Sequence, residues 1–167
     1  MISSGWYNKN MKEVPYKAPN FRLSDENGKT KTLADFAGKW LVLYFYPKDD
    51  TPGCTAESCS LSENIKSFEK LGVAVVGISK CSVKKHDKFK AKYDLQFPLA
   101  SDEESDVCER YGVWAQKSMY GRKYMGIERT TFLIDENGVI EKIWPKVKVE
   151  GHTEEILEAL KGKKKAA

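Results

Sequence analysis

The apolar residues of this chain fall into short runs separated by turn residues, a pattern typical of an α/β protein. Two runs, Leu41–Tyr46 and Val73–Ile78, are almost entirely apolar and predict strands that are buried on both faces. Between them, from Thr55 until Gly72, the apolar residues follow helical spacing. A strand, a helix and a second strand in this order predict two parallel strands joined by a right-handed crossover.

Two hairpins are predicted, because an Asp-Glu-Asn-Gly turn separates strand-forming residues at two places in the chain. The first joins residues 21–23 to residues 29–32 and should cover one edge of the domain. The second joins residues 130–134 to residues 139–144. The remaining chain predicts a helical turn at 33–36, helices at 83–93 and from 153 to about 162, a short helix between Asp102 and Cys108, an edge strand at 97–99 and an irregular loop at 112–126.

These elements predict an α/β, thioredoxin-like fold, in which a mixed central sheet is flanked by helices and accompanied by an N-terminal β-hairpin. The length of 167 residues, with 41% apolar and 31% charged residues, suits one compact domain that spans residues 1–167. Within it we expect residues 1–17 to form an N-terminal extension and residues 162–167 a frayed, solvated, lysine-rich tail.

Cys54 lies where the turn after the first buried strand passes into a helix. Pro47 ends that strand, and residues 48–53 have the composition of a turn. A helix N-terminus presents unpaired backbone N–H groups and the positive end of the helix dipole, and both favour a thiolate over a thiol. We therefore expect Cys54 to be largely ionised and nucleophilic at neutral pH.

Cys59 follows five residues later on the same predicted helix. On an intact helix, Cα atoms five positions apart are separated by roughly 8 to 9 Å, whereas a disulfide needs less than about 7 Å. The two cysteines can therefore form a bond only if the first turns of the helix unwind. Ser58, Ser60 and Ser62 are mediocre helix formers, and we expect them to make this unwinding easy.

Three motifs in the chain resemble those of the peroxiredoxins, specifically the bacterioferritin-comigratory-protein or PrxQ group. The phrase YPKDDTPGCT carries the family's spacing of Pro47, Thr51 and Cys54, and Cys59 matches the group's local resolving cysteine. The phrase RTTFLID, which begins at Arg129, matches the segment that holds the family's active-site arginine. The motifs occur in the family's order, and the resemblance covers most of the chain.

The resemblance implies a thiol-dependent peroxidase that reduces hydrogen peroxide and organic hydroperoxides without a prosthetic group. Cys54 would attack the peroxide and become a sulfenic acid. Thr51 would hydrogen-bond the thiolate or the peroxide, and Pro47 would shield the pocket from water. Arg129 would keep the thiolate ionised and stabilise the transition state. Cys59 would condense with the sulfenic acid to a disulfide that a thioredoxin-type reductant opens, and the group favours a monomer.

Several residues leave alternatives open. Cys81 competes with Cys59 as the resolving residue, and Cys59 is alternatively a helix cysteine packed in the core. Cys108 is expected in the core because it lies among apolar positions of a short helix. Glu57 either pairs with Arg129 or is a solvated charge on the helix.

No metal or cofactor site is predicted. Two cysteines separated by four residues lack the usual zinc spacing, and His86 and His152 belong to no ligand pattern, so we expect both histidines at the surface or in helix capping. Two readings other than an enzyme remain. One is a metal-binding module built on Cys54 and Cys59, and the other is a redox-switched binding protein whose partner recognises the melted helix.

The charge and the apolar profile limit the partners. A net charge of +4 is the small remainder of 28 basic and 24 acidic residues, and lysines cluster only at the C-terminus, so no nucleic-acid partner is inferred. No apolar run is long enough for a signal peptide or a membrane span, which predicts a cytoplasmic protein without a membrane partner. In that reducing compartment, a close cysteine pair indicates catalysis or metal binding rather than a permanent disulfide.

Overall fold

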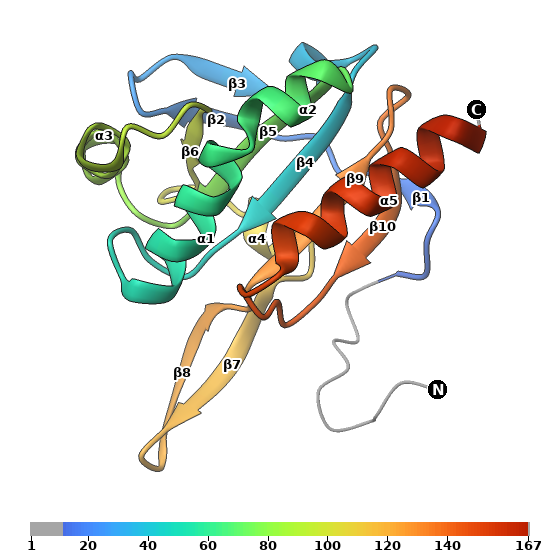
Figure 1. The fold of residues 1–167 in the computed structure, drawn as a ribbon. Coiled ribbons are helices and arrows are strands. Elements are labelled where there is room, and N and C mark those ends of the chain that lie inside the picture. Colours follow the sequence, from blue (N-terminus) through green and yellow to red (C-terminus); the bar gives the residue numbers. More distant parts are fainter. Residues whose placement is uncertain (1–11, 167) are drawn as a thin grey trace.

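An eight-stranded mixed sheet runs through the middle of the molecule, and helices lie on both of its faces (Figure 1). The computed structural model describes residues 12–166, with side chains for residues 12–163. In order across the sheet, the strands are β1 (Tyr16–Lys17), β10 (Val139–Trp144), β9 (Thr130–Ile134), β4 (Trp40–Phe45), β5 (Val73–Ser79), β6 (Leu99–Ser101), β2 (Arg22–Asp25) and β3 (Thr30–Thr32). The helices are η1 (Leu33–Phe36, a 3₁₀ helix), α1 (Pro52–Glu63), α2 (Ile65–Lys70), α3 (Val83–Tyr93), α4 (Val107–Arg110) and α5 (His152–Ala166). A separate two-stranded sheet consists of β7 (Trp114–Met119) and β8 (Arg122–Ile127).

β4 lies near the centre of the main sheet, parallel to β5 and antiparallel to β9. All of its residues are buried, because other parts of the chain cover both faces of the sheet at this strand. The parallel β4–β5 pair and the antiparallel hairpins β2–β3 and β9–β10 match the arrangement predicted from the sequence. The predicted mixed sheet, with its flanking helices and its N-terminal hairpin, is therefore confirmed.

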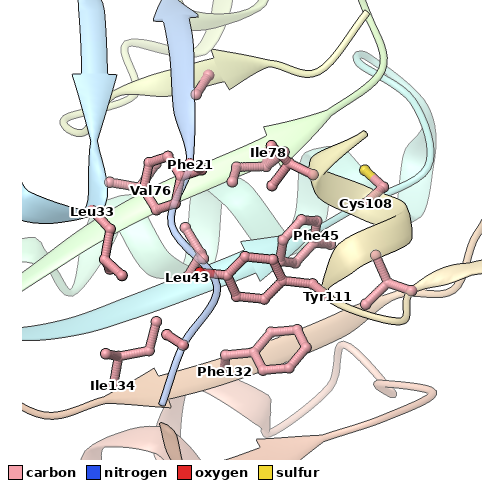
Figure 2. Packing of buried hydrophobic residues seen from close by; sticks show 14 of the residues in the cluster. Phe21, Leu33, Leu43, Phe45, Val76, Ile78, Cys108, Tyr111, Phe132 and Ile134 are labelled. Carbon is pink, nitrogen blue, oxygen red and sulfur yellow. The ribbon is translucent and has the colours of Figure 1, made fainter. Parts of the chain in front are cut away.

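Two hydrophobic cores lie on opposite faces of the sheet, because successive side chains of β4 alternate between them. Leu43 and Phe45 face the first core, where Figure 2 shows Phe45 close to Tyr111 and Phe132. Tyr44 faces the second core, which includes residues of α1, α2, α3 and α5. The helix that carries Cys54 therefore packs on the second face.

Residues 112–126 contain a regular hairpin, so the expectation of an irregular loop is wrong. β7 and β8 pair along their whole length. Tyr120 and Gly121 between them have positive φ angles of 52° and 79°, which suit a tight turn that matches the twist of the strands. Such turns usually contain Asn-Gly or Asp-Gly, and the pair Tyr-Gly is not that signal.

β6 begins two residues later than the predicted edge strand and is an internal strand of the sheet. It pairs with β5 on one side and with β2 on the other. Pro98, which suggested an edge, precedes the strand, and its carbonyl accepts a hydrogen bond from the N–H of Gly77 at 3.1 Å. The proline therefore does not interrupt the pairing.

The predicted long helix after Cys54 is two helices. α1 begins at Pro52, earlier than predicted, and α2 follows it after a break at Asn64. The side-chain amide of Asn64 donates to the carbonyl oxygen of Ser60 at 2.8 Å, and its backbone, with φ −100° and ψ 11°, leaves helical geometry. The break confines the Cys54 helix to twelve residues.

Parts of the two predicted terminal segments have regular secondary structure. Residues 16–17, within the expected extension, form β1 and pair with β10. Residues 1–11 of that extension lie outside the described residues. α5 continues to Ala166, so the expected tail is helical over residues 162–166. The short helix predicted between Asp102 and Cys108 begins later, since α4 spans Val107–Arg110, although the Asp102 carboxylate accepts hydrogen bonds from the N–H groups of Val107 and Cys108 at its start.

Tyr44 connects the sheet to α1. Its hydroxyl forms a hydrogen bond with Ser58 Oγ at 2.7 Å. Its ring lies over Gly77 of the neighbouring strand, where an added Cβ would come within 2.8 Å of the ring. Gly77 therefore leaves the space that Tyr44 needs to reach α1.

Gly77→Ala should destabilise the protein by about 1–3 kcal/mol, because the added methyl group would overlap the Tyr44 ring. The free energy of unfolding from denaturant titration measures this effect. Gly162→Ala is a matched control, since Gly162 lies inside α5 with nothing within 4 Å of an added Cβ. The control should stabilise the protein by about 0.5–1 kcal/mol. Equal effects of the two substitutions would contradict the tight fit at Gly77.

Candidate active site

Cys54 is the third residue of α1, directly after the loop that leaves β4. Thr51 precedes the helix in an extended conformation, and Pro52 is its first residue, a position that suits a proline. The Cys54 side chain is 1% exposed and belongs to the core between the sheet and α1. The structure thus places the thiol at a helix N-terminus, as the sequence predicts.

Arg129 reaches Cys54 from the residue before β9. Its Nη2 donates a hydrogen bond to Cys54 Sγ at 3.3 Å, and its Nη1 donates to Glu57 Oε1 at 2.7 Å. A Cβ at Gly53 would lie 3.1 Å from Nη2, so this glycine leaves room for the guanidinium. Of the two alternatives that the sequence leaves open for Glu57, the observed one is the pairing with Arg129.

One guanidinium therefore faces two groups that can carry negative charge. Burial is the larger effect on Glu57 and raises its pKa to about 7, although the charge and the hydrogen bond of Arg129 act in the opposite direction. Burial would lower the pKa of Arg129, but the charges of Glu57 and Cys54 outweigh it and the pKa is raised. Glu57 Oε2 is buried and has no hydrogen-bond partner among the described residues. Burial therefore makes Glu57 easier to protonate than an ordinary glutamate, and a protonated Glu57 would leave more of the guanidinium charge to the sulfur.

Thr51 and Pro47 belong to the loop before α1, and both are half-buried. The Thr51 hydroxyl donates to the carbonyl oxygen of Lys48 at 2.9 Å. Because its single proton is used there, the hydroxyl oxygen is left to accept a hydrogen bond, such as one from the O–H of a peroxide. The structure thus brings Pro47, Thr51 and Cys54 onto one loop and helix start.

Asp49 fixes this loop to α3 through a buried network. Its Oδ1 accepts a hydrogen bond from the Tyr46 hydroxyl at 2.6 Å, and its Oδ2 lies 2.7 Å from Nδ1 of His86. The other ring nitrogen of His86 lies 3.1 Å from the carbonyl oxygen of Ala100, so both nitrogens face acceptors. The imidazole of His86 therefore joins the Asp49 carboxylate on the active-site loop to the carbonyl of Ala100 on β6, and the contact with Asp49 is buried on both sides.

Asp50 provides a second anchor on the same helix. Its backbone has a φ of 58°, in the left-handed region, directly before Thr51. For a residue other than glycine this conformation costs about 1 kcal/mol or more. The Asp50 carboxylate accepts hydrogen bonds from the Tyr93 hydroxyl at 2.5 Å and from Lys92 at 2.8 Å, both on α3. α3 therefore holds the strained turn that positions Thr51.

Both histidines are buried, so the expectation that they lie at the surface or cap helices is wrong. His152 begins α5, where its Nε2 lies 2.8 Å from the hydroxyl of Thr131, and burial lowers its pKa. His86 shares the inner face of α3 with Phe89. Its helical spacing to that apolar residue is the sequence signal that predicts burial, and Asp49 is the partner that makes burial possible.

The four cysteines are all free thiols in different surroundings. Cys59 is half-buried on the unbroken α1, and burial raises its pKa. Cys108 is buried in α4 as predicted, and burial raises its pKa as well. Cys81 is half-buried behind the active-site loop, where its Sγ accepts a hydrogen bond from the backbone N–H of Asp49 at 3.4 Å.

Within residues 12–166, no three histidine, cysteine or acidic side chains are grouped so that they could hold a metal ion. In the same part of the chain, no helix combines the length and the apolar character needed to cross a bilayer.

Glu57→Gln should change how the stability of the protein depends on pH. The pKa of Glu57 in the folded protein, about 7, lies above its ordinary value of 4.5, so folding favours the protonated carboxyl. The stability from this effect is fully present below pH 4.5 and is lost as the pH rises through about 7. Because glutamine does not ionise, the free energy of unfolding of the wild type minus that of the variant should fall over this interval, by up to about 1.4 kcal/mol per pH unit. Urea titrations across this range measure the difference, and a constant difference would show that Glu57 ionises normally.

Comparison with known proteins relates most of the chain to one family. Residues 14–143 match the model of the AhpC/TSA family. A putative peroxiredoxin Bcp of Coxiella burnetii is 56% identical over 145 residues, which are 87% of this chain and 96% of the relative. Peroxiredoxin Bcp of Bacillus subtilis is 48% identical over 149 residues, which are 89% of this chain and 95% of the relative.

Solved structures agree with this relationship. Peroxiredoxin Q of Xanthomonas campestris has a TM-score of 0.81 at 46% sequence identity, with 85% of this chain and 90% of that chain covered. A structure of the bacterioferritin comigratory protein of the same organism, 45% identical, concerns the alkyl peroxide reduction activity of that protein. The likeness confirms the thioredoxin-like fold. The chain belongs to the AhpC/TSA family and, within it, to the Bcp/PrxQ peroxiredoxins.

Proposed function

We propose that this protein is a thiol-dependent peroxidase that reduces hydrogen peroxide and organic hydroperoxides, with Cys54 as the nucleophile. The observation that supports this most directly is the contact of Arg129 Nη2 with Cys54 Sγ at 3.3 Å, at the N-terminus of α1. A thiolate needs lasting positive charge beside it, and a guanidinium stays protonated over the physiological pH range. The alkyl peroxide reduction of the Xanthomonas campestris relative supports the same reaction class.

The first step converts the Cys54 thiolate to a sulfenic acid. The sulfur attacks one oxygen of the peroxide, the O–O bond breaks, and its electron pair leaves on the second oxygen, which takes up a proton as water or an alcohol. The sulfur loses two electrons and the peroxide gains them. Arg129 stabilises the charge that moves from the sulfur to the leaving oxygen. Thr51 accepts a hydrogen bond from the peroxide, and Pro47 limits the access of water.

Cys59 then resolves the sulfenic acid. Its sulfur attacks the sulfur of Cys54, an S–S bond forms, and the sulfenic oxygen leaves as water. Both cysteines lie on α1, which is continuous from Pro52 to Glu63, and on such a helix they are too far apart to bond. The first turns of α1 therefore unwind before the bond forms.

A thioredoxin-type dithiol protein completes the cycle by reducing the disulfide. The chain acts as a monomer in the cytoplasm and needs no cofactor, because the two cysteines and the reductant carry all the electrons.

Cys54→Ser should abolish peroxide consumption in an assay with thioredoxin, thioredoxin reductase and NADPH, because serine is not an effective nucleophile towards peroxide. Cys108→Ala is the matched control, since it removes a buried thiol outside the site and should keep the wild-type rate. Many turnovers per molecule are expected, whereas a redox-switched binding protein would react once and stop. Wild-type activity in Cys54→Ser would overturn the assignment of the nucleophile.

Peroxide-treated protein should contain a Cys54–Cys59 disulfide, detected by mass spectrometry of its peptides. Amide hydrogens of residues 54–62 should exchange at least about ten-fold faster in the oxidised form, because the bond requires unwinding of α1. Cys59→Ser should keep the first oxidation of Cys54 and lose turnover with thioredoxin, while Cys81→Ser should keep both. A dominant Cys54–Cys81 link would make Cys81 the resolving residue, and equal exchange in both forms would exclude unwinding.

A further inference from the structure

The β7–β8 hairpin carries most of the large apolar side chains that the described part of the chain exposes. Beside Val14, these are Met119 (57% exposed), Tyr120 (100%), Tyr124 (45%) and Met125 (50%). Figure 1 shows the hairpin projecting from the body of the molecule, outside the main sheet. Apolar side chains gathered at one exposed place are typical of an interaction surface.

The same hairpin is basic. Residues 112–127 include Lys117, Arg122 and Lys123 and contain no aspartate or glutamate. The whole chain has 28 basic and 24 acidic residues, so 25 basic and 24 acidic residues remain outside the hairpin. Three of the four net positive charges therefore lie on this one element, and a partner that it attracts is negatively charged.

Tyr120, at the tip of the hairpin, is strained and fully exposed. Its φ of 52° lies in the left-handed region, where asparagine and glycine are the usual residues. Its side chain is 100% exposed, so packing within the monomer does not offset the strain. Strained residues of this kind are concentrated at functional sites.

Four exposed or half-buried side chains of the hairpin lie on one face. Lys117 pairs with Tyr124 and Met119 pairs with Arg122, and alternate pairs share a face, so all four lie on the same side. Met125 lies on the opposite side.

The inner end of this face lies close to the catalytic groups. At the root of the hairpin, the N–H of Glu128 donates to the carbonyl oxygen of Val113 at 2.7 Å, and Arg129 is the next residue. Burial lowers the pKa of Lys117, while the nearby charge of Glu128 acts in the opposite direction. The hairpin therefore begins two residues from Arg129, which contacts the Cys54 thiol, and its exposed side chains continue from there to the tip.

We propose that this face, formed by Lys117, Met119, Tyr120, Arg122 and Tyr124, is the docking surface for the dithiol protein that reduces the Cys54–Cys59 disulfide. The inference rests on the proposed function. The partner presents an apolar contact surface with acidic residues around it. A reducing protein must cover the rim of the active site to bring its thiolate to a sulfur of α1, and the hairpin face extends outward from that rim. An anionic lipid surface would contact only the side chains at the tip of the hairpin. The apolar and basic side chains continue from the tip inward to Lys117, which favours a protein partner.

The proposed contact serves a balanced thiol–disulfide exchange. A thiolate of the partner attacks one sulfur of the disulfide, and the other sulfur leaves as a thiolate, which gives a mixed disulfide. The second thiol of the partner then attacks its own neighbouring sulfur and releases the remaining cysteine of the peroxiredoxin. The partner loses two electrons, and Cys54 and Cys59 regain their reduced forms.

The double variant Met119→Gln with Tyr120→Asn tests the docking surface in the full chain. Asparagine tolerates left-handed backbone, so the turn is retained. With an acidic thioredoxin as reductant, the kcat/KM for thioredoxin should fall about ten-fold or more. The second-order rate constant for oxidation of Cys54 by hydrogen peroxide, and turnover supported by dithiothreitol, should stay at wild-type values. Arg122→Glu, which reverses a charge on the proposed face, should lower the association rate with thioredoxin and weaken its dependence on salt.

Lys66→Glu with Lys70→Glu is the matched control, because it reverses two exposed charges on α2, and it should react with thioredoxin as the wild type does. Wild-type kinetics with thioredoxin in both hairpin variants would overturn the proposal. Loss of co-sedimentation with phosphatidylglycerol vesicles in those variants, with unchanged thioredoxin kinetics, would overturn it in favour of lipid binding. The proposed function is tested separately by treating the wild-type protein with peroxide. Failure to oxidise Cys54 would refute the peroxidase function and the docking surface that rests on it, whereas normal oxidation of Cys54 together with wild-type thioredoxin kinetics in both variants would refute the docking surface alone.

Discussion

The candidate site depends on one guanidinium that is held between two acidic groups. Arg129 contacts Cys54 through Nη2 and Glu57 through Nη1. Attraction between such charges is strong in a buried place, but each charge also loses its hydration there. At Glu57 the loss of hydration is the larger effect, because the pKa is raised to about 7 despite the adjacent cation. Glu57 thus orients the guanidinium through a hydrogen bond without fully neutralising it, and the positive charge remains available to the sulfur.

The rest of the fold keeps that guanidinium within reach of the sulfur. β9 begins directly after Arg129 and pairs with β4, while the loop after β4 leads to Cys54, so the main sheet sets the distance between the two groups. Gly53 leaves the space through which the guanidinium passes. On the other side of the loop, α3 binds Asp49 and Asp50 and so holds a strained turn that would relax if it were free. Preorganisation of this kind is what electrostatic catalysis requires.

Sequence pattern alone predicted the elements whose signals are local. The two buried strands, both Asn-Gly hairpins and the helix start at Cys54 are examples. That Arg129 would face the thiol was implied only by the resemblance of its motif to the peroxiredoxins. Prediction failed where a tertiary contact replaces a local signal. The burial of His86 depends on acceptors from Asp49 and Ala100, which lie on other elements. The hairpin around Tyr120 lacks the usual turn residues, so no local signal in the sequence predicts that β7 and β8 pair along their whole length.

The low helix propensity of the serines in α1 predicts easy unwinding of this helix. In the structure, however, their side chains oppose unwinding. Each makes a hydrogen bond to a residue outside the helix: Ser58 with Tyr44 at 2.7 Å, Ser60 with Thr153 at 2.7 Å, and Ser62 with the backbone N–H of Gln96 at 2.9 Å. A hydrogen bond of this kind contributes about 1 kcal/mol, so opening the helix costs several of them in addition to its own backbone bonds. Spontaneous fraying of α1 is therefore suppressed in the reduced protein, and Cys54 stays beside Arg129 until it reacts. In the proposed mechanism, oxidation of Cys54 to a sulfenic acid changes the group that Arg129 contacts, so the chemical step itself would be the event that weakens this contact and lets the helix open.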